Sequence, residues 1–450
     1  MVTTLAVFTR DLRVHDNPML AAATLAGEHT VPLFVLDAAM ARTGFATGAR
    51  QRFLAESLAD LDQSLRALGG RLVVRAGDPV EQVCRVADEV GAGTVHLAAD
   101  CSGYAQRREA ALRSALAEHG RTLHCHDEAH VVVGPGRVTP AGRDHYAVFG
   151  AYHRRWEAAG WRRVIAPPAS LRLAAVDPGT LPPISGPAGG GGSAGDGRFH
   201  GGETAGRRRA EKWLREGVED YDERRDQLAA DATSRLSPYL HLGCLSALEL
   251  ATQAGTGDAA RDFVRQLAWR DFFHQLLAAR PAAAHEDYRA AHRTWRDDPA
   301  ALDAWRSGHT GIPIVDAGMR QLLAEGWLPN RARMITASFL TKTLGLDWRA
   351  GAAHYTEHLL DADVANNSLN WQWVAGTGTD TRPGRVLNPL RQAERFDPDG
   401  TYVRRHVPEL AGLPGRAVHR PWRLPDHERA TLDYPEPLPI LPERLTSEQF

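Results

Sequence analysis

The first 130 residues alternate short apolar runs with stretches of helical periodicity, and this alternation constrains the fold more than any other feature. The apolar runs cover residues 5–8, 31–36, 72–74, 94–98 and 122–125. Between the second and third runs, apolar side chains recur at helical spacing and would form one stripe: Phe53, Leu54, Leu58, Leu61, Leu65 and Leu68. This pattern predicts βαβ units, and therefore an α/β domain with a Rossmann-like, doubly wound parallel sheet. No GxGxxG motif follows the first run, so an ordinary nicotinamide dinucleotide site is not expected.

The rest of the chain has a different character. Residues 166–207 are rich in Pro and Gly, including Gly189–Gly192, and such a composition buries too little apolar surface to order itself. Beyond it the β-like alternation almost disappears, and helical stretches occur at 207–216, 259–279 and 330–344. We therefore predict an α/β domain over residues 1–130, an interdomain linker over 131–206 and an all-helical domain over 207–450.

Composition narrows the class of protein. The 450 residues include no apolar run of ~18 and no basic-then-apolar leader at residues 1–12, so we expect a soluble, cytoplasmic, monomeric protein without a membrane partner. Four cysteines occur without a CxxC pair, which argues against a disulfide framework or a cysteine zinc site. The net charge is −2, but residues 376–423 carry nine Arg against five acids. This segment favours a polyanionic partner, with a solvated charged surface as the alternative.

The segment Thr233-Ser-Arg-Leu-Ser-Pro-Tyr-Leu-His-Leu-Gly243 combines hydroxyl groups, an arginine and a helix start. Such groups can hold a pyrophosphate. The alternative, which stays open, is that the Ser and Thr side chains are helix caps.

A second segment, residues 263–273, places Gln266, Trp269, Arg270 and Phe273 on one helical face. That face is both polar and aromatic, although a buried tryptophan in a core helix would also account for part of it. Two further segments are Asn330-Arg-Ala-Arg-Met334 and residues 361–380. The latter begins Asp-Ala-Asp-Val-Ala-Asn-Asn-Ser-Leu-Asn-Trp-Gln-Trp. Its buried acids need partners, and Arg333 could supply one.

Together these segments resemble the cryptochrome/photolyase family, and most closely its class I cyclobutane pyrimidine dimer photolyases. Thr-Ser-Arg-Leu-Ser, Trp-Arg-Asp-Phe-Phe, Asn-Arg-Ala-Arg-Met-Ile-Thr-Ala-Ser-Phe-Leu and Asn-Trp-Gln-Trp follow in the family's order, and residues 9–17 resemble its opening strand and loop. The resemblance extends over nearly the whole chain. It implies that FAD binds in the helical domain and that excited, reduced flavin gives an electron to a dimer in damaged DNA, whose cyclobutane ring then splits.

The resemblance also assigns cofactor residues. Tyr221 and the residues Thr233, Ser234, Arg235, Leu236 and Ser237 would lie at the phosphates of a folded FAD, with Arg333, Asp361 and Asp363 at the isoalloxazine ring. Asn367 matches the Asn expected beside flavin N5, where plant-type cryptochromes tend to carry Asp, so it favours repair over signalling. Trp371, Trp348 and Trp295 match the tryptophan chain that photoreduces the flavin.

For the lesion, Trp269 and Trp373 would form walls around an extruded dimer. The residues expected at the DNA are Gln266, Arg270, Asn330, Arg331, Met334 and Gln392, and the basic segment would make binding salt-dependent. Gln266 stands where dimer photolyases usually have Glu, and it cannot donate a proton. Gln also occurs there in (6-4) photolyases, but the positions matching their His pair are Asn330 and Met334, which makes (6-4) repair an alternative rather than the expectation.

A second chromophore is common in this family. Asp37 and residues 100–108 resemble members that bind the deazaflavin 8-HDF more than those that bind methenyltetrahydrofolate, although Gly103 replaces an expected Pro and Asp37 could be a strand-end turn residue.

Two other functions stay open. A cryptochrome-like photoreceptor often has a long C-terminal extension, whereas this chain stops soon after Pro435-Glu-Pro437. A redox flavoprotein without light chemistry would leave the two tryptophans and the basic segment unexplained. No metal is expected, because four histidines of the helical domain lack ligand-like companions in the sequence: His241, His274, His354 and His358.

Overall fold

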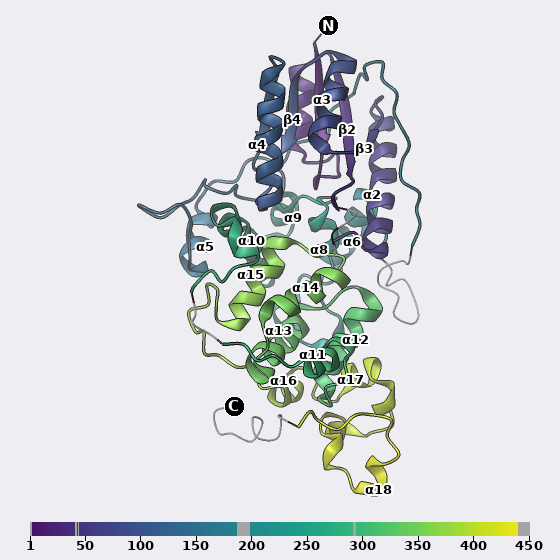
Figure 1. Cartoon of the computed structure of the whole chain (residues 1–450), viewed down its shortest axis with the longest axis vertical. Helices are drawn as coiled ribbons and strands as arrows, with labels where there is room; N and C mark the ends of the chain where they lie inside the picture. The colour runs from purple at the N-terminus through teal and green to yellow at the C-terminus, as the bar shows by residue number, and fades with distance from the viewer. Residues whose placement is uncertain (1, 41–42, 44, 187–198, 291–293, 440–450) are drawn as a thin grey trace.

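The computed structural model describes residues 2–40, 43, 45–186, 199–290 and 294–439. The glycine run 189–192 of the expected linker lies outside these residues. The chain forms a sheet-containing part, at the top of Figure 1, and a larger helical part below it.

The sheet has five parallel strands, as the alternation predicted, and their order is β3-β2-β1-β4-β5. Its strands and associated helices are β1 (Thr3–Phe8), α1 (Pro18–Ala26), β2 (His29–Asp37), α2 (Gly48–Ala67), β3 (Val73–Gly77), α3 (Pro79–Val90), β4 (Ala92–Ala98), α4 (Gly103–Glu118) and β5 (Thr122–His126). Every residue of the central strand β1 is buried, because both faces of the sheet are covered. The strand order reverses between β1 and β4, the position at which open α/β sheets bind ligands.

Local signals explain where these helices begin and end. Asn17 caps α1 by accepting a hydrogen bond from the Leu20 N–H at 3.0 Å, and Pro18 follows it. Asp78 and Pro79 begin α3 in the same way, and Gly91 ends it in the left-handed conformation. In α2 the apolar stripe packs on the core, as predicted, with Phe53 and Leu58 almost completely buried.

After β5 the described chain contains helices and no further strand, which confirms the helical second part. The α-helices are α5 (Phe149–Glu157), α6 (Glu203–Glu216), α7 (Tyr221–Arg224), α8 (Ser237–His241), α9 (Ala247–Gln253), α10 (Asp258–Ala279), α11 (Pro299–Ser307), α12 (Pro313–Glu325), α13 (Asn330–Ser338), α14 (Trp348–His358), α15 (Val364–Ala375), α16 (Pro389–Phe396), α17 (Thr401–His406) and α18 (Asp426–Arg429). The stretch 330–344, expected as one helix, is α13 followed by a π-helical turn at Phe339–Leu344. None of the helices in the described ranges is long and apolar enough to cross a membrane.

The segment expected as a linker, residues 131–206, contains a packed helix. Helix α5 lies against α10, and its Tyr152 and Trp156 are buried. The Asp271 carboxylate of α10 accepts hydrogen bonds from the Val132 and Val133 N–H groups and from Trp156 Nε1, at 2.9 to 3.0 Å. The first part of this segment therefore belongs to the core, and the domain boundaries remain our proposal.

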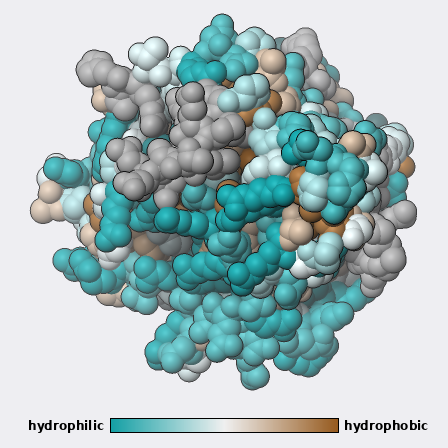
Figure 2. Space-filling view, turned by 90° about the horizontal axis from the view of Figure 1, so that it is seen from below, coloured by the Kyte–Doolittle hydropathy of each residue, from teal (hydrophilic) through white to brown (hydrophobic). Residues whose placement is uncertain are grey.

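The two parts meet where the chain leaves β1. A Cβ on Gly243 would lie 1.7 Å from the Arg10 carbonyl oxygen, and Gly243 has φ +66°, so only glycine fits there. The Leu12 N–H donates to the Leu242 carbonyl at 3.2 Å, and Arg13 donates to the Gly243 carbonyl at 3.0 Å. This close approach brings Arg10 between the sheet and the helical part. Figure 2 shows the opposite, helical end of the molecule, whose surface is mainly hydrophilic.

Candidate functional site

A cavity of about 470 Å³ in the helical part collects most of the residues singled out in the sequence. Those that line it are Tyr221, Thr233, Ser234, Arg235, Leu236, Ser237, Gln266, Trp269, Arg270, Asn330, Arg333, Met334, Asp361, Asp363, Asn367, Trp371 and Trp373. Trp295, Arg331, Trp348 and Gln392 do not line it. Segments from six helices (α7, α8, α10, α13, α14 and α15) and from the loops before α8 and α15 therefore converge on one space, within the size range of ligand pockets.

The loop before α8 presents hydroxyl groups that do not cap that helix. The N-cap of α8 is Leu236, without a side-chain cap, whereas Ser246 caps α9 by accepting from the Glu249 N–H at 3.2 Å. Thr233 Oγ1 is buried and has no hydrogen-bond partner in the described structure. The helix-cap alternative therefore fails for Thr233, whose hydroxyl stays available to a ligand.

Arg235 shapes the same loop. Its backbone adopts φ +51°, a conformation that costs a non-glycine residue on the order of 1–2 kcal/mol. Its guanidinium pairs with Glu325 at 3.0 Å and with Asp231 at 2.8 Å, and lies 4.2 Å from the centre of the Trp327 ring. These contacts fix the arginine in the cavity wall.

Arg333 and Asp361 form the ion pair that the sequence suggested. Arg333 Nη2 lies 3.0 and 2.8 Å from the two Asp361 oxygens, and Arg333 Nε donates to the Leu328 carbonyl at 2.9 Å. On α15, the Asn367 amide nitrogen donates to the Ala352 carbonyl at 2.9 Å and to Thr356 Oγ1 at 3.0 Å. Asn367 therefore uses its NH₂ group to hold α14 and keeps its oxygen as an acceptor.

Asp363 links this cavity to the sheet. Its Oδ2 lies 2.8 Å from Arg10 Nη1 and 3.3 Å from His274 Nε2, while Oδ1 caps α15 by accepting from the Asn366 N–H at 2.8 Å. Burial would raise the pKa of Asp363, but His274 and Arg10 hold that pKa well below its usual value. Arg10 Nε also pairs with Asp100 at 2.8 Å. The sequence did not single out Arg10, because its partners are distant in the chain.

Two tryptophans stand in the cavity wall. The Trp269 ring stacks on Phe149 of α5 with 3.6 Å between ring centres and 7° between planes. The Arg385 guanidinium lies 5.4 Å from the centre of the Trp373 ring. Both tryptophans are half-buried, so part of each ring remains exposed. Phe149 was missed because it falls in the segment expected as a linker.

The side chains expected to contact DNA differ in how far they are already engaged in contacts within the protein. Gln266 donates to the Asp262 carbonyl at 3.3 Å, and Arg270 is buried and donates to the backbone carbonyls of His130 and Leu240. Arg331 pairs with Asp226 at 2.5 Å, and its Nη1 lies 3.5 Å from Gln392 Oε1. Exposed Asn330 lies beside Met334, with 3.6 Å from Nδ2 to Sδ. Their contacts with DNA stay predictions.

The three tryptophans of the expected electron-transfer chain occupy different depths. Trp371 is buried, and its Nε1 has no hydrogen-bond partner in the described structure. Trp348 is buried at the start of α14, which packs on α15, and its Nε1 donates to Asp287 at 2.8 Å. Trp295 is half-buried. No sequence motif pointed to two other neighbours of the Trp371 ring, Tyr355 at 5.0 Å and Trp305 at 5.9 Å between ring centres.

These groups fit the FAD that the resemblance implied. Among the described residues, three that line the cavity have a buried polar atom without a protein partner, and buried groups of this kind require one: Thr233 Oγ1, His241 Nδ1 and Trp371 Nε1. Arg235 and Arg333 also line the cavity, each held by ion pairs with carboxylates, and their guanidinium groups can donate to a ligand. The cavity therefore offers hydrogen-bond groups and cations to a large, anionic, aromatic cofactor.

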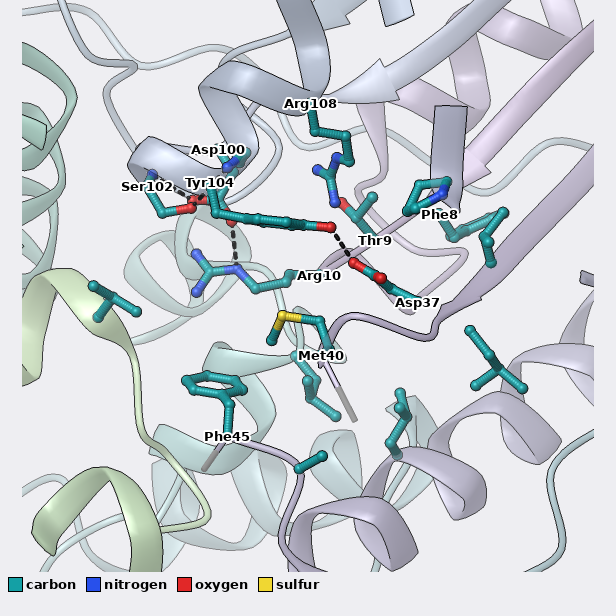
Figure 3. A pocket seen from close by; sticks show the side chains of 18 of the residues that line it. Phe8, Thr9, Arg10, Asp37, Met40, Phe45, Asp100, Ser102, Tyr104 and Arg108 are labelled. Atoms are coloured by element: carbon teal, nitrogen blue, oxygen red, sulfur yellow. Dashed lines mark hydrogen bonds and ion pairs between the residues drawn. The ribbon is translucent and has the colours of Figure 1, made fainter. Parts of the chain in front are cut away.

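A second cavity, of about 880 Å³, lies at the carboxyl ends of the strands (Figure 3). Its walls are largely apolar and include Phe8, Met40 and Phe45, with Arg10 and Asp100 joined by their ion pair. The Tyr104 hydroxyl donates to Asp37 Oδ2 across it, while Asp37 Oδ1 accepts from the Ala39 N–H at 2.7 Å. Asp37 is therefore both a strand-end turn residue, as the alternative held, and a polar group of the wall.

One residue belongs to both cavities. His241, at the end of α8, lines each of them, and burial lowers its pKa to about 4. It is therefore neutral at neutral pH. Together with the Arg10 ion pairs, it makes up the polar part of the wall between the cavities.

Comparison with known proteins agrees with this geometry. Residues 4–170 match the family described as DNA photolyase, and residues 263–445 match the FAD binding domain of DNA photolyase. A deoxyribodipyrimidine photo-lyase of Streptomyces griseus is 53% identical over 98% of this chain and 97% of its own. A cryptochrome DASH of Gloeobacter violaceus is 37% identical over 97% of this chain and 93% of its own. The crystal structure of a class III photolyase from Agrobacterium tumefaciens superposes with a TM-score of 0.88 at 32% identity, covering 97% of this chain and 94% of that one.

Proposed function

This chain belongs to the cryptochrome/photolyase family, and we propose that it is a deoxyribodipyrimidine photolyase that repairs cyclobutane pyrimidine dimers in DNA under blue light with FAD as cofactor. The observation that carries this proposal is the single cavity that holds both the expected cofactor residues and the half-buried Trp269 and Trp373. The similarity to the Streptomyces griseus enzyme supports the same activity.

When bound and reduced, FAD supplies a light-excited electron for the dimer, whose cyclobutane ring opens before the electron returns. Thr233 and Arg235 would hold its phosphates, and the Arg333–Asp361 pair would hold its ring system. Asn367 would present its amide oxygen to a protonated ring nitrogen, because its NH₂ group already donates to α14. This acceptor favours a neutral, protonated ring over an anionic one.

The lesion would lie between the exposed edges of Trp269 and Trp373, which exclude water from an extruded, apolar dimer. Phe149 keeps the Trp269 ring in place through their stack. Gln266 reaches the same cavity and could donate an amide hydrogen bond to the dimer, although it cannot give a proton. The basic segment 376–423 would follow the DNA phosphates.

The larger cavity supports an antenna chromophore, for which 8-HDF remains our preferred candidate over methenyltetrahydrofolate. Its apolar walls suit a flat ring system, and the Asp37–Tyr104 pair offers polar contacts at one edge. Gly103 stands where a Pro is expected, but no open space remains at this position. A Cβ built on Gly103 would lie 3.3 Å from the Pro281 side chain. The protein would be reconstituted with each chromophore in turn, and energy transfer from the chromophore to the flavin would be measured by fluorescence. This measurement would identify the chromophore that binds in the larger cavity.

A cryptochrome-like photoreceptor is the second candidate, favoured by the similarity to a cryptochrome DASH. The deciding experiment uses purified, pre-reduced protein and oligonucleotides with one cyclobutane dimer or one (6-4) photoproduct, with dark controls. Light-dependent loss of the dimer alone is expected. Loss of only the (6-4) product would reassign the substrate, and loss of neither, with FAD bound, would favour the photoreceptor. We also propose that the protein is a cytoplasmic monomer. Gel filtration would test the monomeric state, and cell fractionation would test the location.

A further inference from the structure

The last turn of α14 carries a compact group of potential metal ligands that repair does not use. His354, Glu357 and His358 occupy positions i, i+3 and i+4, and therefore lie on one side of the helix. One side-chain nitrogen of each histidine and one Glu357 oxygen lie within 4.8 Å of one another. Two histidines at i and i+4 on a helix form a recurrent zinc-binding arrangement.

The buried ring of His354 has a nitrogen that needs a partner. The His354 side chain is only 7% exposed, its Nε2 has no hydrogen-bond partner in the described structure, and its ring centre lies 4.5 Å from that of His358. A buried polar atom of this kind requires a partner, and a metal ion bound by both imidazoles would supply one.

Some charges around the cluster repel a cation and others attract it. Arg306 and Arg50 lie close enough to lower the pKa of His354 and His358, respectively, and they oppose a cation. The Glu357 carboxylate lies 4.0 Å from His358 Nε2 and offers a negative charge. The carbonyl groups at the C-terminal end of α14 add a partial negative charge of about half an electron. Glu357 and the helix end together offset the two arginines.

We propose that His354, Glu357 and His358 bind one divalent transition-metal ion, and that Zn²⁺ is the ion this ligand set fits. Two imidazoles and one carboxylate form a zinc ligand set, whereas Mg²⁺ and Ca²⁺ prefer oxygen ligands alone. Zinc–ligand distances of about 2.0–2.2 Å require ligand atoms closer than 4.8 Å, so the Glu357 and His358 side chains must turn inward. Both are free to do so, since they are 63% and 30% exposed. Water would fill the remaining position.

The test uses the full, FAD-loaded chain after dialysis against a chelator, titrated with Zn²⁺ in competition with a coloured chelator. We expect one Zn²⁺ per chain, and at least tenfold weaker binding in each of Glu357→Gln and His358→Gln. His427→Gln is the matched control, because exposed His427 also lies beside a glutamate, with 3.9 Å from Nε2 to Glu428 Oε1, but is not part of this cluster. Its affinity for Zn²⁺ should equal that of the wild type.

A second readout is the melting temperature, which Zn²⁺ should raise in the wild type and in His427→Gln but not in Glu357→Gln. Flavin absorbance in the same samples confirms that each variant is folded. Absence of saturable Zn²⁺ binding by the wild type would overturn the proposal, and so would equal binding by the wild type and both site variants. Because these experiments measure bound metal, their outcome does not depend on whether the chain repairs DNA.

Discussion

Gly351 leaves the space that the Trp371 indole occupies, and replacing it offers a direct test of the role of that tryptophan. A Cβ on Gly351 would lie 2.2 Å from Trp371 Cη2, 2.5 Å from Cζ3 and 2.7 Å from Leu340 Cδ2. Contacts this short are not sustained, so the buried indole must shift or tilt in Gly351→Ala. Electron transfer through Trp371 would then begin from a displaced ring.

The expected change in stability is the difference between two effects. Ala in place of Gly inside a helix stabilises by about 1 kcal/mol, whereas overpacking a tight core costs about 1–3 kcal/mol. Gly351→Ala should therefore lower the free energy of unfolding by about 0–2 kcal/mol. Gly150→Ala is the control, because Gly150 lies in α5 and, apart from its own helix turn, no described residue comes within 4 Å of its Cβ position. This variant should be more stable by about 0.5–1 kcal/mol.

Urea unfolding and light-driven reduction of the oxidised flavin measure the two consequences. Gly351→Ala should photoreduce more slowly than the wild type, while Gly150→Ala should photoreduce at the wild-type rate. If Gly351→Ala matched Gly150→Ala in both stability and photoreduction rate, the added methyl group would not have displaced the Trp371 ring, and the predicted effect would be refuted.

Three further predictions concern the lesion site, the electron path and the pH dependence of stability. Trp269→Ala should weaken binding to dimer-containing DNA while FAD absorbance is retained; unchanged affinity in a binding titration would remove Trp269 from the lesion site. Trp371→Phe should slow photoreduction yet spare repair by chemically reduced enzyme, and a normal photoreduction rate would exclude it from the electron path. Burial lowers the pKa of both His96 and His241 from 6.5 to about 4, so the unfolded chain takes up protons first as the pH falls. The free energy of unfolding should therefore decline between pH 6.5 and 4, by about 1.4 kcal/mol per pH unit for each histidine, and equal urea midpoints at pH 7 and 5 would contradict this.

The sequence predicted the sheet and the composition of the cavity because both depend on local patterns. Short apolar runs predicted the five strands, and short motifs such as Thr233–Ser237 and Trp269–Phe273 indicated the segments that converge on the cavity. The assignment of roles needed the family resemblance, since three tryptophans among eleven have no distinguishing spacing.

Residues whose importance depends on distant partners could not be found in this way. Phe149 was included in a linker because the chain around it has weak periodicity, yet its ring lies 3.6 Å from that of Trp269, which is 120 residues away in the sequence. We predicted that His354 and His358 lack ligand-like companions, but the Glu357 carboxylate lies with them in one cluster. Local spacing identifies elements, but it does not identify which elements become neighbours.

Arg10 connects the walls of the two cavities, because it forms an ion pair with a carboxylate from each part of the chain. It contributes one nitrogen to Asp100 from the sheet-containing part and another to Asp363 from the helical part, and the side chains of these two residues are only 8% and 7% exposed. A buried charge without its partner costs several kcal/mol, so the Asp363 carboxylate depends on Arg10 from the other part of the chain. Asp363 also caps the helix that carries Asn367 and Trp371. The loop after β1 therefore helps to build the cavity of the helical part, and a core cluster that continues from β1 through α10 to α15 joins the two parts into one structural unit.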